Sequence, residues 1–278
     1  MLRGASVESP AQAAQTVPEQ KRNYWHYQYR LGKDYLVPLL RNWGVELQGA
    51  WVLDIGCAEG GVLVAFCEAG ARCTGLEISP ERAKIGRSLL PETCKGEVSF
   101  VVGDFHHAPL MLSQRTPDLI LLRDVFEHLE DKLRVMADLR RLMGRQTRLL
   151  ITFPPFFSPF GGHQQMLRGP LRKVPYFHAL PGPLWRLARA YIRRYDANPG
   201  FLAEMEKLRN HRISIGAFEK MLRFYGLRVE RAQFYLMRPS HKLRYGWPVI
   251  SANRLGRVPW LREFLISGAF FLIARGEE

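Results

Sequence analysis

The segment Trp51–Gly61 constrains the fold of this chain more than any other part of the sequence. It reads W-V-L-D-I-G-C-A-E-G-G, an apolar strand that runs into a turn built from small residues. The residues after the turn suit a helix, and a second apolar run then ends at Glu77. In nucleotide-binding βαβ units an acidic residue at that position bonds ribose hydroxyls. The segment therefore predicts a site for an adenosine-containing ligand.

The spacing of the small residues in the turn narrows the choice of ligand. A dinucleotide fingerprint reads G-x-G-x-x-G, whereas Gly56, Ala58 and Gly60 give G-x-A-x-G. Small residues at these positions let the backbone approach a ligand closely. Asp54 precedes the turn and Glu59 lies inside it. We expect carboxylates there to repel a pyrophosphate and to tolerate a cationic ligand.

This turn resembles the first motif of the class I S-adenosylmethionine-dependent methyltransferases, commonly (D/E)-x-G-x-G-x-G, with Ala58 replacing the middle glycine. Two further segments match that family in the same order. Gly103-Asp104-Phe105 follows a β-branched run, as the adenine motif of the family does. Arg123–Leu129 then resembles the family's "dvlEHl" segment after the fourth strand. The resemblance covers roughly residues 45–153.

The resemblance implies S-adenosylmethionine as the cofactor and suggests which residues contact it. In the family, the acid at the position of Asp104 bonds the adenine amino group and its neighbour flanks the ring. Tyr27 lies in an aromatic segment expected to form a helix before the first strand, where core packing is the alternative role. The expected cofactor contacts are Asp54, Gly56, Cys57, Ala58, Gly60, Glu77, Ile78, Asp104, Phe105, Arg123 and Tyr27.

Alternating strands and helices predict an α/β fold with a Rossmann-like, mostly parallel sheet and helices on both faces. The family resemblance implies seven strands in the order 3-2-1-4-5-7-6, with an antiparallel final pair expected at 227–236 and 267–274. We expect a disordered leader over residues 1–20, followed by a cover helix and the cofactor-binding core over 21–153. A basic helical cap, inserted after strand five, is expected over 154–211. The C-terminal part of the core is expected over 212–278, with an excursion at 238–262.

The positive charge of the chain is concentrated in its C-terminal part. Residues 1–153 contain 19 Lys and Arg against 18 Asp and Glu, whereas residues 154–278 contain 21 against 8. This asymmetry indicates an anionic partner, substrate or surface, or alternatively helices solvated by arginine. The residues 183–195 predict a basic amphipathic helix, which suits either an anionic membrane surface or a lid over the active site.

Cysteine usage and hydropathy bear on the compartment. Cys57, Cys67, Cys73 and Cys94 form no C-x-x-C pair, so we expect buried thiols and no metal or disulfide. The N-terminus lacks a secretory pattern, and the longest apolar run, at 264–274, is about half the length of a membrane span. These features predict a cytoplasmic protein, either free in solution or peripheral on a membrane surface.

Methyl transfer from an activated cofactor needs chiefly alignment of the acceptor and a group that takes its proton. His128 follows the fourth predicted strand, with Glu127 beside it, and His163 lies in the loop after the fifth. Because neutral imidazole accepts a proton near neutral pH, His163 and His128 are the expected catalytic residues. The alternatives are a helix-start hydrogen bond for His128 and a loop-bracing contact for His163.

The aromatic loop after strand five bears on the substrate. Phe153, Phe156, Phe157 and Phe160 suit an apolar substrate wall, or alternatively an anchor for the cap. We predict methyl transfer to O, C or S of a small hydrophobic or aromatic molecule. The basic C-terminal half of the chain is compatible with an anionic or a lipid-soluble substrate. The alternatives are an RNA or other nucleic-acid methyltransferase and a catalytically silent cofactor-binding scaffold. Nucleic acid is the less favoured partner because the sequence has no recognised RNA-binding module.

Overall fold

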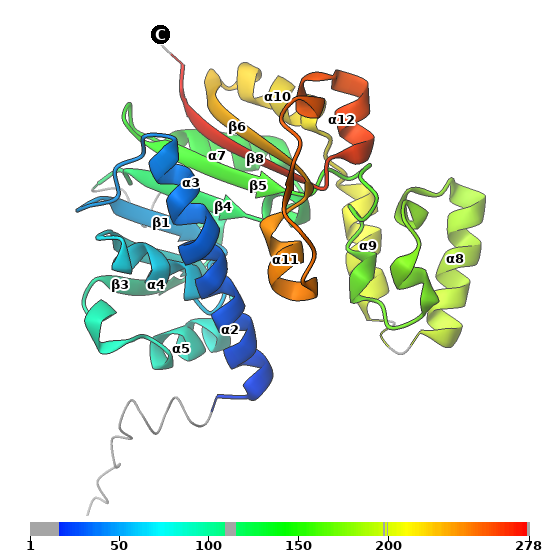
Figure 1. Ribbon diagram of the computed structural model, residues 1–278, viewed down its shortest axis with the longest axis horizontal. Helices are drawn as coiled ribbons and strands as arrows, with labels where there is room; N and C mark the ends of the chain where they lie inside the picture. The colour runs from blue at the N-terminus through cyan, green and yellow to red at the C-terminus, as the bar shows by residue number, and fades with distance from the viewer. Residues whose placement is uncertain (1–16, 109–114, 197, 199, 277–278) are drawn as a thin grey trace, which may run out of the picture. The chain divides into compact units, whose positions relative to one another are not determined.

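The computed structural model describes residues 17–108, 115–196, 198 and 200–276 (Figure 1). The chain divides into two compact units, residues 1–120 and 121–278. The boundaries predicted at residues 153 and 211 both fall inside the second unit. Most of the predicted leader lies outside the described residues, but Glu19 and Gln20 already belong to a helix. The leader was predicted too long at this end because Val17 is buried and Pro18 starts the helix.

Parallel strands form the sheet of the first unit. β1 pairs with β2, and β2 pairs with β3, in the βαβ arrangement that the sequence predicts. The strands are β1 (Trp51–Ile55), β2 (Arg72–Glu77) and β3 (Val98–Val102). The helices are α2 (Glu19–Leu31), the π-helix η1 (Gly32–Leu36), α3 (Val37–Asn42), α4 (Gly61–Glu68) and α5 (Pro80–Ser88), with 3-10 turns η2 (Glu92–Cys94) and η3 (Phe105–His107).

Helix α2 packs against α4, the helix that follows the glycine turn (Figure 1). Two glycines make this approach possible. A Cβ at Gly61 would lie 2.3 Å from the backbone oxygen of Trp25, and a Cβ at Gly32 would lie 2.7 Å from the Cβ of Ala65. The helix expected before the first strand is therefore present, and it is fixed by backbone contact as well as by its aromatic side chains.

The second unit holds the antiparallel part of the sheet, and β4 (Leu119–Arg123) crosses the boundary between the units. β8 lies between β5 and β6 and is antiparallel to both. The other strands are β5 (Arg148–Phe153), β6 (Leu227–Met237), β7 (Ile250–Ser251) and β8 (Gly268–Arg275). The α-helices are α7 (Lys132–Leu142), α8 (Gly182–Tyr195), α9 (Phe201–Asn210), α10 (Ile215–Phe224), α11 (Pro239–Tyr245) and α12 (Pro259–Leu265).

The order of the strands is β3-β2-β1-β4-β5-β8-β6-β7. It confirms the expected 3-2-1-4-5-7-6 arrangement, with β6 and β8 as the antiparallel final pair. It also adds an eighth strand, because part of the predicted excursion pairs with β6 as the two-residue strand β7. A strand of that length leaves no periodic pattern in a sequence, so it was not expected.

Four phenylalanines form the centre of the second unit. Phe126, Phe153, Phe218 and Phe271 are fully buried. Their ring centroids lie 5.1 to 6.1 Å apart in tilted, edge-to-face and stacked pairs, the range in which aromatic pairs attract. Phe153 is therefore a core residue and cannot be the substrate wall that was one of its two expected roles. Phe156 is buried as well.

The segment 154–211 has an apolar cluster of its own. It includes α8 and α9, which lie side by side, and the 3-10 turns η5 (Gln164–Met166), η6 (Pro170–Lys173) and η7 (Phe177–Ala179) (Figure 1). The buried cluster consists of Leu167, Phe177, Trp185, Ile192, Leu202 and Met205. The predicted amphipathic helix is thus present as α8, with its inner face packed into this cluster. Its action as a cap stays a prediction.

Candidate functional site

The turn after β1 depends on backbone conformations that favour glycine. Gly56, Ala58 and Gly60 have φ angles of 72°, 55° and 73°, in the left-handed region. A Cβ at Gly60 would lie 2.5 Å from the Cζ of Phe100, so only glycine fits there. Ala58 adopts the same conformation with a side chain, which costs on the order of 1 kcal/mol. Alternating left-handed residues thus shape the turn.

Glu77 fixes this turn to the end of β2. One carboxylate oxygen accepts the backbone N–H of Ala58 and the other accepts that of Ser79, both at 2.9 Å. The side chain is only 5% exposed. Each carboxylate oxygen has a second lone pair, so Glu77 can still accept two hydroxyl hydrogens. The turn and the acid together fit the ribose and the adjoining part of an adenosyl group.

Glu59, inside the turn, is paired with two cations of the protein. Its fully buried carboxylate accepts two hydrogen bonds from Arg82 at 3.1 Å and one from Lys21 at 3.2 Å. The charge of Glu59 is therefore neutralised by protein cations on α2 and α5. The expected tolerance of a cationic ligand at this position stays a prediction, and the carboxylate itself is already paired with neighbours distant in sequence.

The other residues of the first unit expected at the cofactor differ in exposure. The Cys57 thiol is fully buried against Gly75, so only its backbone is available to a ligand. Asp104 is exposed and accepts the N–H of His106 at 2.8 Å. Phe105 is buried, Ile78 is well exposed and Tyr27 is partly exposed. Asp54 is fully buried at the end of β1. The structure brings Ala58 and Glu77 into contact, and the cofactor roles of all these residues stay predictions.

Asp124 begins the polar site of the second unit, directly after Arg123 at the end of β4. Its φ angle is 52°, and its N–H donates to the backbone oxygen of Thr152 at 2.8 Å. Its carboxylate accepts a hydrogen bond from Arg238 at 2.8 Å. Burial raises the pKa of Asp124, but the Arg238 guanidinium outweighs it and the net pKa is lowered. Arg123 is partly buried, and its expected cofactor contact stays a prediction.

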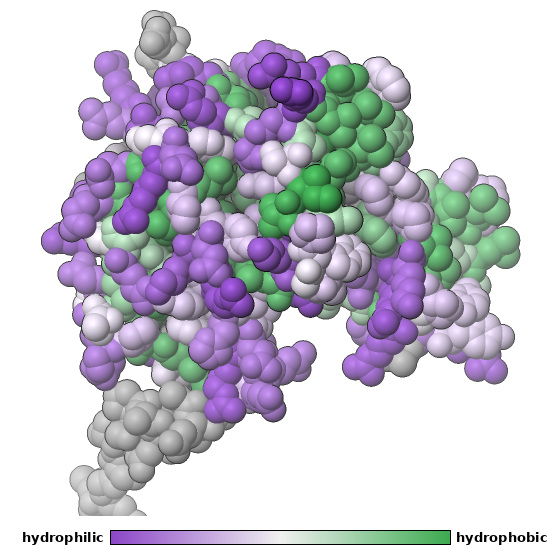
Figure 2. Space-filling view, in the orientation of Figure 1, coloured by the Kyte–Doolittle hydropathy of each residue, from purple (hydrophilic) through white to green (hydrophobic). Residues whose placement is uncertain are grey.

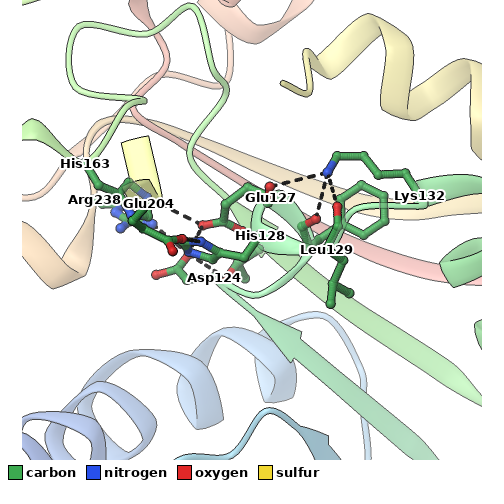
Figure 3. A network of polar contacts seen from close by, with 10 residues as sticks. Asp124, Glu127, His128, Leu129, Lys132, His163, Glu204 and Arg238 are labelled. Atoms are coloured by element: carbon green, nitrogen blue, oxygen red, sulfur yellow. Dashed lines mark hydrogen bonds and ion pairs between the residues drawn. The ribbon is translucent and has the colours of Figure 1, made fainter. Parts of the chain in front are cut away.

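Glu127 is the least compensated acid of this site. It is 3% exposed, and neither of its carboxylate oxygens has a hydrogen-bond partner among the described residues. Burial raises its pKa to about 7. The Nε2 atoms of His128 and His163 lie 3.7 Å and 3.6 Å from the same Oε1 atom (Figure 3). The two histidines expected to be catalytic thus converge on one buried carboxylate.

The pKa values of the two imidazoles are shifted in opposite directions. The Nδ1 atom of His128 lies 2.5 Å from Oε1 of Glu204 on α9. Burial lowers the pKa of His128, but the hydrogen bond to Glu204 outweighs it and the net pKa is raised. Burial lowers the pKa of His163 to about 3, so His163 is neutral near pH 7. The rings pack edge to face, with centroids 5.1 Å apart.

Lys132 holds the backbone that carries this cluster. Its ammonium donates to the carbonyl oxygens of Phe126, Glu127 and Leu129 at 3.2, 3.3 and 2.7 Å (Figure 3). Burial lowers the pKa of Lys132 to about 8. The Lys132 ammonium thus binds backbone carbonyl oxygens and makes no hydrogen bond to the Glu127 carboxylate. It fixes the turn but leaves the buried carboxylate without a donor among the described residues.

A small cavity of about 20 Å³ adjoins His163, enough space for a water-sized group. Burial lowers the pKa of His241 to about 4, so this imidazole is also neutral near pH 7. The hydroxyl of Ser158 and Nε2 of His163 have no hydrogen-bond partner among the described residues. The cavity is lined by Pro154, Ser158, Phe160, His163, Gln165, Arg238, His241 and Ser267.

Sequence reasoning missed Glu204, Arg238 and His241. Each comes from an element distant from the "EHL" segment in sequence, and no local pattern marks any of them as polar partners. Arg238 precedes α11 in the predicted excursion, and Glu204 lies on α9, a helix that was not individually predicted. The Arg238 ion pair with Asp124 and the Glu204 contact with His128 are products of tertiary structure.

Comparison with known proteins agrees with the fold. A family model described as a methyltransferase domain matches residues 24–232. An uncharacterized methyltransferase of Mycolicibacterium gilvum is 25% identical over 83% of this chain and 78% of its own length. A magnesium-protoporphyrin O-methyltransferase of Rhodobacter capsulatus is 33% identical over 34% of this chain and 42% of its own. A solved S-adenosylmethionine-dependent methyltransferase from Mesorhizobium loti superposes with a TM-score of 0.51 at 15% identity, covering 86% of this chain and 96% of its own.

Proposed function

This chain belongs to the methyltransferase domain family of class I, S-adenosylmethionine-dependent enzymes, and we propose that it methylates a hydroxyl oxygen of a small hydrophobic or aromatic molecule. The observation that carries the proposal is the convergence of His128 and His163 on buried Glu127. Of the expected acceptors, a hydroxyl needs more help to lose its proton than a thiol, because its pKa is higher. The match to an O-methyltransferase supports the same acceptor atom.

In the first unit, Glu77 and the turn hold the cofactor. The free lone pairs of the Glu77 carboxylate accept the ribose hydroxyls, and Asp104 accepts from the adenine amino group. When bound, S-adenosylmethionine supplies a methyl group that is already activated by a positively charged sulfur. The turn at Ala58 is held open by its hydrogen bond to Glu77, so the backbone needs no rearrangement to receive the ligand.

In the second unit, His163 and His128 act as the catalytic residues that activate the acceptor. Neutral His163 and buried Glu127 offer lone pairs in a largely buried site, where such groups interact strongly with a hydroxyl. Arg238 borders the cavity, where its guanidinium is paired with Asp124. Phe160 supplies an apolar part of the same wall.

The outer face of α8 supports contact with an anionic membrane. Leu184, Leu187, Tyr191 and Tyr195 are exposed along this helix, opposite the buried Trp185. Figure 2 shows hydrophobic side chains gathered over α8 and over α12. Exposed arginines on α8 complement anionic lipids. Among the described residues, none of the helices combines the length and the apolar character needed to cross a bilayer. A cytoplasmic protein that docks peripherally would thereby reach lipid-soluble substrates.

The test is transfer of a labelled methyl group from S-adenosylmethionine to components of a cell extract. We expect label in the organic-soluble small-molecule fraction, on an oxygen, and none with the His163→Asn variant. Calorimetry must show that this variant still binds the cofactor. Label in the RNA fraction would replace the proposal with a nucleic-acid methyltransferase, and cofactor binding without any labelled product would indicate a silent scaffold.

A further inference from the structure

The cluster around Glu127 has the dimensions of a metal site. Ligand atoms of Glu127, His128 and His163 all lie within 4.8 Å of one another. Oε1 of Glu127 is 3.7 Å and 3.6 Å from the two imidazole Nε2 atoms. Neighbouring ligands of a four-coordinate ion with bonds near 2.1 Å lie about 3.4 Å apart. Two of the three ligand–ligand distances are therefore within a few tenths of an ångström of this value, and the third, between the two imidazoles, is at most 4.8 Å.

The same atoms lack other partners. Both carboxylate oxygens of Glu127 and the Nε2 of His163 are buried without a hydrogen bond among the described residues. A buried carboxylate in that condition is costly unless it is protonated or meets a positive charge. The neighbouring cations are committed elsewhere, since Lys132 binds carbonyl oxygens and Arg238 binds Asp124.

Glu204 adds an independent observation. Its carboxylate engages the Nδ1 atom of His128 at 2.5 Å, and the Nε2 atom of the same ring faces Glu127 at 3.7 Å (Figure 3). A carboxylate that accepts from the far nitrogen is the usual support of a metal-binding histidine, because it fixes the ring and strengthens the donor atom. A histidine that only paired with Glu127 would not need this arrangement.

We propose that Glu127, His128 and His163 hold one divalent transition-metal ion. Two imidazoles and one carboxylate suit ions of the zinc, manganese and iron(II) type, and three protein ligands leave coordination positions open. No metal is expected from the sequence, because the cysteines form no C-x-x-C pair, and His163 is separated from the "EHL" segment by a helix and a strand. The third ligand is brought to the other two only by the fold.

The assignment deepens the proposed function and rests on it for its role. A hydroxyl that occupies an open position of the ion becomes more acidic, because the cation stabilises its conjugate base. Its proton passes to solvent water, and the oxygen lone pair is left free to form the bond to the methyl carbon while the electrons of the carbon–sulfur bond return to sulfur. Nε2 of His163 then binds the ion and takes no proton.

The experiment is metal binding to the full chain, stripped with chelator and free of cofactor and substrate. Calorimetric titration with ZnCl₂ and with MnCl₂ should give one site for at least one ion, and that ion should raise the thermal midpoint. Glu127→Gln and His163→Asn should weaken its binding at least a hundredfold, and Glu204→Gln about tenfold to a hundredfold. His107→Asn, an exposed histidine of the first unit, is the matched control and should bind like wild type.

Failure to saturate the wild-type chain at one equivalent with either ion would overturn the proposal. So would ligand variants that fold, as shown by circular dichroism, and bind as tightly as wild type. Because the half-buried Glu204 side chain is not a ligand, its variant tests the site even if a variant of a fully buried residue misfolds. Methyl transfer that persists in chelator would leave the proposed function standing without the metal role, whereas metal binding without methyl transfer would leave only the site.

Discussion

The two polar sites of this protein are built in opposite ways. In the first unit, every oxygen of Glu77 and Glu59 is engaged by a neighbouring N–H or side-chain cation. In the second unit, Glu127 is equally buried and has no hydrogen bond to its carboxylate among the described residues. The first arrangement stabilises the turn after β1, whereas the second leaves a buried carboxylate without a hydrogen-bond donor from the described part of the chain. Reactive sites are where such uncompensated groups are expected.

The two units also differ in net charge. Residues 1–120 contain 12 Lys and Arg against 13 Asp and Glu, and residues 121–278 contain 28 against 13. A nearly neutral unit suits a cofactor that carries both signs of charge. The strongly basic unit suits an anionic surface or substrate, because the summed potential attracts such a partner from a distance.

The largest expected effect is on cofactor affinity. Glu77→Ala should weaken binding of S-adenosylmethionine about a hundredfold or more, because two hydrogen bonds to a charged acceptor contribute about 1.5 to 3 kcal/mol each. Titration calorimetry measures this change. Glu81→Ala removes an exposed acid from the first turn of α5 and should bind like wild type. Wild-type affinity in Glu77→Ala would disprove the assignment of the ribose site.

Replacing Glu59, which is paired with two cations, and replacing Glu127 should change the free energy of unfolding in opposite directions. Glu59→Ala should lower the free energy of unfolding by about 2 kcal/mol, because Arg82 and Lys21 lose their partner. The cost is below that of a wholly buried pair, since both cations are about one-third exposed. Urea unfolding measures it. Glu97→Ala, which breaks the exposed pair with Arg72, should change stability by less than about 1 kcal/mol.

Removing the charge of Glu127 should instead stabilise the metal-free protein at high pH. The pKa of Glu127 is raised to about 7, so ionisation opposes folding progressively from about pH 4.5 to pH 7 and fully above. Glu127→Gln should therefore gain stability at pH 8, by up to about 3 kcal/mol, and gain little at pH 4. The lowered pKa of His163 acts in the other direction, costing stability as the pH falls below about 6.5. Urea midpoints at the two pH values in chelator measure the difference, and an equal gain at both would contradict this account.

The smallest expected effect is at the surface of α8. Leu187 is 70% exposed, so Leu187→Ser should change the free energy of unfolding by no more than about 0.5 kcal/mol. The affinity of the Leu187→Ser variant for anionic vesicles, measured by sedimentation, should nevertheless fall about tenfold. One leucine buried in the membrane contributes about 1.5 kcal/mol or more. Leu133→Ser on α7 alters an exposed leucine outside α8 and serves as the control. Equal losses in both variants would remove α8 as the membrane-binding face.

The sequence by itself determined the turn after β1 and the acid that closes it, because both depend on short stretches of chain. The small residues at Gly56, Ala58 and Gly60 impose the turn, and Glu77 closes it from the end of the next strand. The final pair expected at 227–236 and 267–274 also matches β6 and β8 almost to the residue. Local sequence carries such information because backbone conformation and strand burial are set by neighbouring residues.

Only the tertiary structure decided what the polar groups of the second unit do. His128 and His163 were identifiable as candidates, but their convergence on Glu127, and the supporting contacts of Glu204 and Arg238, join elements far apart in the chain. The same holds for Glu59, whose charge is cancelled by Lys21 and Arg82. Whether a buried charge is paired depends on which distant side chains the fold brings within a few ångströms, and that distance is not encoded in any local pattern.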